Sequence, residues 1–262
     1  MIEKIYKKAV EYALKAGEII RKNYEQDIRI EFKSRIDIVT EVDKKVEDML
    51  VSLIHKDFEG HDIVTEETHI EKTGSEFIWY IDPLDGTTNY SHGFPFFCVS
   101  IGVFQNDEPI VGIVYDPIRD EFFESKKGGI SMMNGKVISP SKIDTIERSL
   151  LSTGFPYDIR ETDNNNVDYF THMIYLAQAI RRGGSAALDL CYVACGRLDG
   201  YWELKLSPWD TAAGILILRN AGGVITDIRG ETKSLLFKEI AATNGLIHDI
   251  LLDELRKAGA NK

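Results

Sequence analysis

The feature of this sequence that most constrains its fold is a change of pattern near residue 148. From residue 63 to about 137 the chain is a succession of short β-branched and aromatic segments, and Asn134-Gly135 near its end is a strong hairpin signal. This pattern predicts strands at 63–65, 77–81, 97–104, 110–115, 121–124 and 130–133. After a strand at 149–153 we expect helices near 166–180, 185–195, 208–221 and 245–258, with strands near 199–204, 223–227 and 239–243 between them. Such a chain belongs to the α/β class, with two sheets that are each backed by helices.

The residues before the first strands are predicted to be helical. Ile5, Ala9 and Tyr12 recur at helical spacing, so residues 2–25 are expected to form one amphipathic helix. Thr40 is the expected cap of a second helix. No linker rich in Pro, Gly or Ser divides the sequence. We therefore expect one compact domain over 1–262, with an N-terminal half at about 1–147 and a C-terminal half at about 148–262.

Composition limits the partners and the compartment. The chain carries 31 Lys plus Arg against 42 Asp plus Glu, a formal net charge of −11, which argues against direct binding of nucleic acid or of anionic membranes. Its cysteines, Cys98, Cys191 and Cys195, are too few for a disulfide framework and are expected to be buried apolar side chains. The lysine-bearing N-terminal helix differs from a signal peptide, and no apolar run approaches the ~20 residues of a membrane span. We expect a soluble, cytoplasmic protein.

Four acidic residues stand at the ends of predicted elements. Glu66 closes one strand, Asp82 and Asp85 follow the next strand, which is expected to end where Asp82 begins, and Asp210 lies at the start of a helix. Open α/β sheets collect their sites at such positions. Carboxylates without Cys or His favour Mg²⁺ or Mn²⁺ over Zn²⁺, and the Leu84 carbonyl in the turn between the two aspartates is a further candidate ligand. A divalent ion would also supply the positive field that an acidic protein lacks toward a phosphate.

Each of these acids also has a structural interpretation. Glu66 and Glu67 could be a solvated pair of surface acids. Asp43, three residues after Thr40, and Asp210, three residues after Ser207, both fit capping-box positions at helix starts.

The Gly86-Thr87-Thr88 segment directly follows the second aspartate of the pair. After a sharp turn its backbone amides could cradle phosphate oxygens as a small anion nest. The same segment could equally be a plain loop, because Asp-Pro and Asp-Gly are ordinary turn dipeptides.

The segments that carry these acids resemble the inositol monophosphatase family. "WYIDPLDGTTNYSHGFPF" is similar to the family's Asp-Pro-Ile-Asp-Gly-Thr-Thr-Asn-Phe signature, and "SPWDTAAGILILRNAGG" is similar to its Trp-Asp-x-Ala-Ala-Gly signature. The Glu-Glu pair and "RRGGSAALDLCYVACGRLDGYWEL" match as well, so the similarity covers nearly the whole chain. The resemblance implies a layered α-β-α-β-α sandwich of the metal-dependent sugar phosphatase type. It implies a lithium-sensitive phosphomonoesterase, usually a homodimer, that hydrolyses myo-inositol monophosphate and related sugar or polyol phosphates with two or three Mg²⁺ ions and no phosphoenzyme.

The resemblance also implies roles for individual residues. The metal ligands fall on Glu66, Asp82, the Leu84 carbonyl, Asp85 and Asp210, with Asp43 as an outer-sphere acid near the third metal. Thr87 and Glu66 match the residues that orient and help deprotonate the metal-bound water, so the catalytic residues are Glu66, Thr87 and Asp82. Substrate contacts fall on Asp85, Gly86, Thr87, Thr88, Gly184, Ser185, Ala186, Glu203 and Asp210. Lys33 lies on a mobile loop.

Other functions compete with this one. A phosphatase with a covalent aspartyl-phosphate would carry a DxD motif near an N-terminal strand, whereas this motif is DxxD and lies mid-chain. Nucleotide 3′-phosphatases and histidinol phosphatases often carry a basic residue where this chain has Thr88. Fructose-1,6-bisphosphatase activity stays open because Arg181 and Arg182 could reach a second phosphate, although they could equally be a solvated or interface pair. Bacterial relatives join transcription and RNA-processing complexes, so a protein partner is a further possibility.

Overall fold

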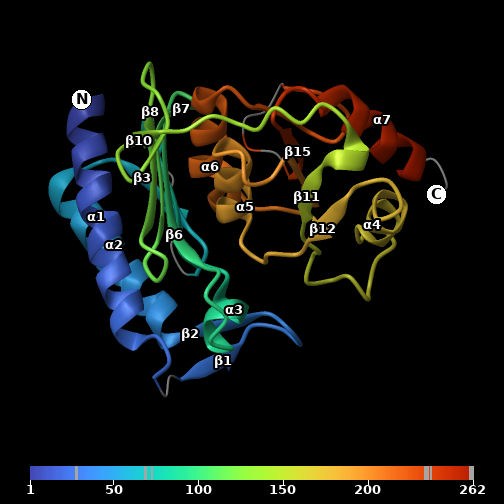
Figure 1. Ribbon diagram of the computed structural model, residues 1–262. Helices are drawn as coiled ribbons and strands as arrows, with labels where there is room; N and C mark the ends of the chain where they lie inside the picture. The colour runs from blue at the N-terminus through green and yellow to red at the C-terminus, as the bar shows by residue number, and fades with distance from the viewer. Residues whose placement is uncertain (27–28, 68–69, 72, 233–235, 237, 260–262) are drawn as a thin grey trace.

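The computed structural model describes residues 1–26, 29–67, 70–71, 73–232, 236 and 238–259. Its elements lie in five layers of helix, sheet, helix, sheet and helix (Figure 1). The helices α1 (Ile2–Asn23) and α2 (Glu41–Asp57) pack on the outer face of an eight-stranded sheet, and α5 (Ala186–Ala194) and α6 (Pro208–Ala221) lie between that sheet and a five-stranded one. The predicted α-β-α-β-α sandwich is confirmed.

The helix α2 begins with the cap that the sequence predicts. The Thr40 side chain accepts hydrogen bonds from the backbone of Val42 and Asp43, and Asp43 Oδ2 accepts one from the Thr40 backbone N–H at 2.9 Å. These reciprocal bonds satisfy amide groups that a helix start leaves without partners. A short hairpin of β1 (Ile30–Phe32) and β2 (Ile38–Thr40) leads into this cap.

The large sheet has the strand order β10-β9-β8-β7-β6-β5-β3-β4. Its strands are β3 (Asp62–Thr65), β4 (Ile70–Glu71), β5 (Phe77–Asp85), β6 (Cys98–Gln105), β7 (Glu108–Asp116), β8 (Glu121–Lys126), β9 (Met132–Met133) and β10 (Lys136–Val137). Neighbouring strands are antiparallel except β3 and β5, which are parallel. The predicted succession of strands and the hairpin at Asn134-Gly135 are therefore confirmed.

The strand β5 does not end at Ile81, as the sequence suggested, but continues to Asp85 through a β-bulge. Asp82 pairs with Ser100 and Asp85 with Cys98, so three steps along β5 oppose two steps along β6. Pro83 lies in this bulge and has no N–H to donate to the ladder. Residues three apart would normally face opposite sides of a strand. The extra residue brings the two aspartates opposite partners on one face of β6.

The five-stranded sheet has the order β12-β11-β13-β15-β14. Its strands are β11 (Leu150–Thr153), β12 (Ala179–Arg181), β13 (Gly200–Leu204), β14 (Val224–Thr226) and β15 (Glu239–Thr243), and its outer face is covered by α4 (Val167–Met173) and α7 (His248–Gly259), with a 3-10 turn at Ile146–Arg148 before it. The helix predicted at 166–180 is wrong beyond Met173, because residues 179–181 pair with β11 as an edge strand. The unpaired edge of β11 needs hydrogen-bond partners, and this need overrides the local helical pattern.

The helix α6 approaches the large sheet closely at two glycines. A Cβ atom on Gly102 would lie 2.5 Å from the Ala212 Cβ, and one on Gly112 would lie 2.5 Å from the Ala213 carbonyl oxygen. Only residues without a side chain allow this contact. The close packing brings the start of α6, which carries Asp210, to the end of β5. No helix in the described part of the chain is long and apolar enough to cross a membrane.

Candidate active site

One cavity of about 720 Å³ gathers most of the predicted site residues. Its walls come from the end of β5, the start of α3 (Thr87–Ser91), the turn before α5, the end of β13 and the start of α6. The predicted residues that line it are Lys33, Glu66, Asp82, Asp85, Gly86, Thr87, Thr88, Arg182, Gly184, Ser185, Ala186, Glu203 and Asp210. Asp43, Leu84 and Arg181 do not line it.

Three aspartates lie together at the floor of this cavity. Burial raises the pKa of Asp82 well above its ordinary value, and the negative charges of Glu66, Asp85 and Asp210 raise it further. Burial likewise raises the pKa of Asp85 to about 6, although the Ser185 hydroxyl donates to Asp85 Oδ2 at 2.7 Å. The pKa of Asp210 is raised mainly by burial and then by neighbouring carboxylates. Such mutual repulsion marks a place where a cation would be stabilised.

Each aspartate is held by a hydrogen bond that uses one of its oxygens. Asp82 Oδ1 accepts the Leu84 N–H at 3.0 Å, and Asp85 Oδ2 also accepts the Ala187 N–H at 2.8 Å. Asp210 Oδ2 accepts the Ser207 N–H at 2.7 Å, as the capping interpretation predicts. The second oxygen of each carboxylate remains for another partner.

Glu66 is paired with Lys33, from the loop between β1 and β2. The Lys33 ammonium lies 3.0 Å from Glu66 Oε1 and 2.6 Å from Glu67 Oε1. Burial opposes the charge on Lys33, but the two carboxylates raise its pKa overall. The Glu67 side chain is only 3% exposed, and burial raises its pKa to about 7. A solvated pair of surface acids is therefore the wrong interpretation for Glu67.

The Thr87 hydroxyl is held by hydrogen-bond contacts with Asp43 and Leu84. It lies 2.8 Å from Asp43 Oδ1 and 2.9 Å from the Leu84 carbonyl oxygen. Asp43 is fully buried, and burial raises its pKa to about 6. Asp43 thus caps α2 with one oxygen and contacts Thr87 with the other, so it reaches the site through Thr87.

Glu203, at the end of β13, also lines the cavity. The Tyr201 hydroxyl donates a hydrogen bond to Glu203 Oε2, and burial raises the pKa of the Glu203 carboxyl to about 7. A Cβ atom on Gly154 would lie 2.1 Å from Glu203 Oε1, so this glycine leaves space for the carboxylate. Arg182 lines the cavity too, whereas Arg181 on the edge strand β12 does not.

Part of the cavity lining comes from residues that the sequence motifs do not indicate. Residues 155–160 and Lys205 also line the cavity, and Lys205 Nζ contacts Asp158 Oδ2 at 2.6 Å. The segment follows β11, which runs parallel to β13. Sites collect beyond the carboxyl ends of parallel strands, so the position of residues 154–160 after a predicted strand was an available signal.

The donor set fits a hard divalent cation. Carboxylate and carbonyl oxygens without Cys or His are the ligands that Mg²⁺ and Mn²⁺ prefer. As they stand, the described residues include no group of three or more His, Cys, Asp or Glu side chains that could hold a metal ion. In this arrangement Glu66 is bonded to Lys33, and Asp85 to Ser185 and Ala187.

Comparison with known proteins agrees with the fold. The model of the inositol monophosphatase family matches residues 1–260, and the chain belongs to this family. Inositol-1-monophosphatase of Synechocystis is 43% identical over 249 residues, which are 94% of this chain and 87% of that protein. The solved structure of inositol monophosphatase from Anabaena (Nostoc) superposes with a TM-score of 0.89 at 42% identity, covering 97% and 96% of the two chains. Nus factor SuhB of Escherichia coli K12 is 39% identical and covers 95% of this chain and 94% of its own. The chain is therefore a phosphatase of a generally metal-dependent family.

Proposed function

We propose that this protein is a Mg²⁺-dependent phosphomonoesterase that hydrolyses myo-inositol monophosphate and related sugar or polyol phosphates. Water would attack the phosphorus directly, without a phosphoenzyme. The observation that carries the proposal is that Glu66, Asp82, Asp85 and Asp210 line one cavity together with the Gly86-Thr87 backbone. Four acids facing a phosphate would repel it, and bound cations would separate the two.

Two or three Mg²⁺ ions would be held by Glu66, Asp82, Asp85, Asp210 and the Leu84 carbonyl, and Mn²⁺ could replace them. Bound Mg²⁺ neutralises the phosphate oxygens and makes a neighbouring water a stronger acid. Glu66 must first be released from Lys33. Asp85 can keep the hydrogen bonds of Oδ2 to Ser185 and Ala187 and use Oδ1 toward the ion.

Thr87 and Glu66 would orient the attacking water. The Thr87 hydroxyl has one hydrogen, which it can give to the Leu84 carbonyl or to Asp43, and its lone pairs remain able to accept a hydrogen bond from water. The backbone amides of Gly86, Thr87 and Thr88 would bind phosphate oxygens. Gly86 is required at this turn, because its φ is +97° and a Cβ would lie 2.9 Å from the Phe96 carbonyl oxygen.

Glu203 and the Gly184-Ser185-Ala186 turn would bind the hydroxyl groups of the leaving polyol. The Glu203 carboxylate keeps one oxygen for the substrate, because Tyr201 bonds the other. A group that binds hydroxyls rejects substrates that lack them, since its buried oxygen would then lose a partner.

A second candidate substrate is a sugar bisphosphate such as fructose 1,6-bisphosphate. Arg182 lines the cavity and could bind a second phosphate, whereas Arg181 lies outside the cavity lining, which favours Arg182 alone for this role. A further role as a protein partner in transcription complexes is supported by the similarity to Nus factor SuhB. We also propose that the protein is cytoplasmic and forms a homodimer. A sedimentation measurement would test the dimer.

The test is a panel of inositol, sugar and aryl phosphates assayed with Mg²⁺ and with a chelator. We expect Mg²⁺-dependent release of phosphate, with the highest kcat/KM for a polyol monophosphate. Equal activity in chelator, or none on any polyol phosphate, would contradict the proposal. Retention of a protein partner by an inactive Asp82→Asn variant would support the second role.

A further inference from the structure

Asn89 belongs to the Asp-Gly-Thr-Thr-Asn segment, yet none of the roles above uses its side chain. We propose that Asn89 is a positioning residue that sets the distance between the phosphate-binding end of the cavity and the turn that binds the polyol hydroxyls. Asn89 would therefore control discrimination between polyol phosphates and phosphates without hydroxyl groups. The inference rests on the proposed function and assigns to Asn89 a part in the substrate specificity of the enzyme.

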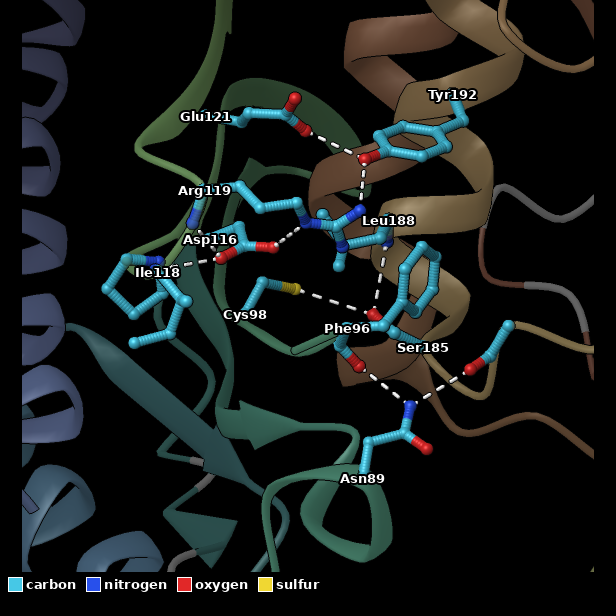
Figure 2. A network of polar contacts seen from close by, with 12 residues as sticks. Asn89, Phe96, Cys98, Asp116, Ile118, Arg119, Glu121, Ser185, Leu188 and Tyr192 are labelled. Atoms are coloured by element: carbon cyan, nitrogen blue, oxygen red, sulfur yellow. Dashed lines mark hydrogen bonds and ion pairs between the residues drawn. The ribbon is translucent and has the colours of Figure 1, made fainter. Parts of the chain in front are cut away.

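The Asn89 amide joins three separate segments of the chain. Asn89 lies in α3, two residues after Thr87, and its Nδ2 donates to the carbonyl oxygens of Phe96 at 2.7 Å and Gly183 at 2.9 Å (Figure 2). Both partners are carbonyl oxygens, which only accept, so the nitrogen of the amide must face them. The two hydrogens of the amide are thus both used to hold backbone from outside α3.

The turn that carries Gly184, Ser185 and Ala186 is fastened at two points. At its first end, Gly183 is held by Asn89. At its other end, Asp85 Oδ2 accepts the Ser185 hydroxyl and the Ala187 N–H. Asp85 is a proposed metal ligand, so the Asp85 contact cannot be changed without changing the chemistry. The hydrogen bond from Asn89 to Gly183 can be removed without changing a proposed metal ligand.

The space around the amide leaves little freedom for the turn. Gly184 has a φ of +86°, and a Cβ there would lie 3.1 Å from Asn89 Nδ2 and 2.6 Å from the Arg182 guanidinium. The turn therefore rests directly on the amide and on the arginine that lines the cavity. If the amide were removed, the turn would gain room to move away from the cavity.

The other acceptor of the amide is itself held in place. The Phe96 ring lies 4.7 Å from the Arg119 guanidinium and 5.7 Å from the Tyr192 ring, and Arg119 donates to the Tyr192 hydroxyl at 2.7 Å (Figure 2). Arg119 is anchored in turn by Asp116 Oδ2 at 2.7 Å. Cation–π contact and these hydrogen bonds fix Phe96 against α5. Asn89 thus ties the turn to the segment around Phe96, whose position is itself fixed.

The test compares Asn89→Ala with wild type on myo-inositol 1-phosphate and on p-nitrophenyl phosphate, both with saturating Mg²⁺. Loss of two neutral hydrogen bonds should raise KM for the inositol phosphate about tenfold, while kcat/KM for the aryl phosphate changes less than about twofold. The phosphate-binding segment stays in place, because Asp85, Gly86 and Thr87 keep their own contacts. A purely structural role would lower stability without separating the two substrates.

The matched control is Asn220→Ala. Asn220 Nδ2 also bridges two acceptors, Ser125 Oγ at 2.8 Å and the Lys126 carbonyl at 3.0 Å, but it joins α6 to β8 outside the cavity lining. We expect Asn220→Ala to melt lower than wild type, as Asn89→Ala should, with the ratio of kcat/KM for the two substrates unchanged.

A second variant displaces the same turn while Asn89 is intact. A Cβ on Gly183 would lie 2.6 Å from Phe96 Cε1, so Gly183→Ala should reproduce the selective rise in KM even if Asn89→Ala does not fold. If wild type hydrolyses both substrates and neither variant changes their ratio, or if Asn220→Ala changes it equally, the inference is wrong. If wild type hydrolyses neither substrate, the proposed function itself fails, which is a different result.

Discussion

Replacing Glu203 by Gln should stabilise the metal-free protein while it weakens substrate binding. Glu203 is a partly buried carboxyl whose pKa rises from 4.5 to about 7, chiefly because burial disfavours its charge. An acid with a raised pKa in the folded state makes folding less favourable as pH increases from 4.5 to 7. That rise corresponds to about 3 kcal/mol at pH 8, of which we expect about 2 kcal/mol to be recovered by Gln, since the side chain keeps some contact with water.

The expected signature is a difference in melting temperature that depends on pH. In chelator at pH 8, Glu203→Gln should melt about 5 °C higher than wild type, because a chain of this size gains about 2–4 °C per kcal/mol. At pH 5 most of the gain should vanish, since the wild-type carboxyl is then protonated in the folded state. The Gln oxygen can still accept the hydrogen bond from the Tyr201 hydroxyl, so this contact within β13 survives.

The same substitution should raise KM for myo-inositol 1-phosphate several-fold more than it lowers kcat/KM for an aryl phosphate. Glu121→Gln is the matched control, because Glu121 also accepts a tyrosine hydroxyl, that of Tyr192 at 2.8 Å, and is bonded to Arg197 outside the cavity. The control should be no more stable than wild type at pH 8. It should leave kinetics unchanged, because the Gln oxygen can still accept the hydroxyl of Tyr192, which braces Phe96. A Glu203→Gln protein that melts lower than wild type at pH 8, or whose gain is the same at pH 5, would refute the reasoning.

Three further results are expected from the carboxylates of the cavity. Millimolar Mg²⁺ should raise the melting temperature relative to chelator, because a ligand of the folded state stabilises it; an unchanged melt would count against the metal site. Asp210→Asn should leave the stability of the metal-free protein unchanged or higher, because it removes one of the clustered charges. The same variant should lower kcat/KM at least about 10²-fold. A less stable variant with normal Mg²⁺-dependent activity would identify Asp210 as a helix cap alone. Li⁺ should inhibit, as the family membership suggests, and a rate unaffected by Li⁺ would place the chain among insensitive relatives.

Most of the sheet and helix pattern could be predicted because it rests on local periodicity. The caps at Thr40 and Ser207 followed from residue types alone, and the structure has both. The edge strand β12 could not be predicted, since residues 179–181 become a strand only because β11 offers an unpaired edge. The prediction of a single domain whose halves meet near residue 147 stays a prediction.

The candidate site was predictable as a set of residues but not as a geometry. The motif identified Asp82 and Asp85, yet the bulge that turns both to one face depends on pairing with Ser100 and Cys98 on the neighbouring strand β6. The contact of Lys33 with Glu66 and the wall formed by residues 155–160 also depend on how distant segments fold together. Long-range pairing leaves no periodic trace in the sequence. The catalytic and ligand roles of these residues stay predictions.

The structural and functional interpretations of Asp43 and Asp210 turn out to be compatible. A carboxylate has two oxygens, and a capping box uses one of them for the backbone of the preceding residues. Asp43 Oδ2 accepts the Thr40 N–H and Asp43 Oδ1 accepts the Thr87 hydroxyl, while Asp210 Oδ2 accepts the Ser207 N–H. The cap fixes the rotamer of each side chain, so the remaining oxygen of Asp210 is held in one place at low entropic cost. An acid at a helix start is thus well suited to be a ligand, because the bond that caps the helix also aims the carboxylate.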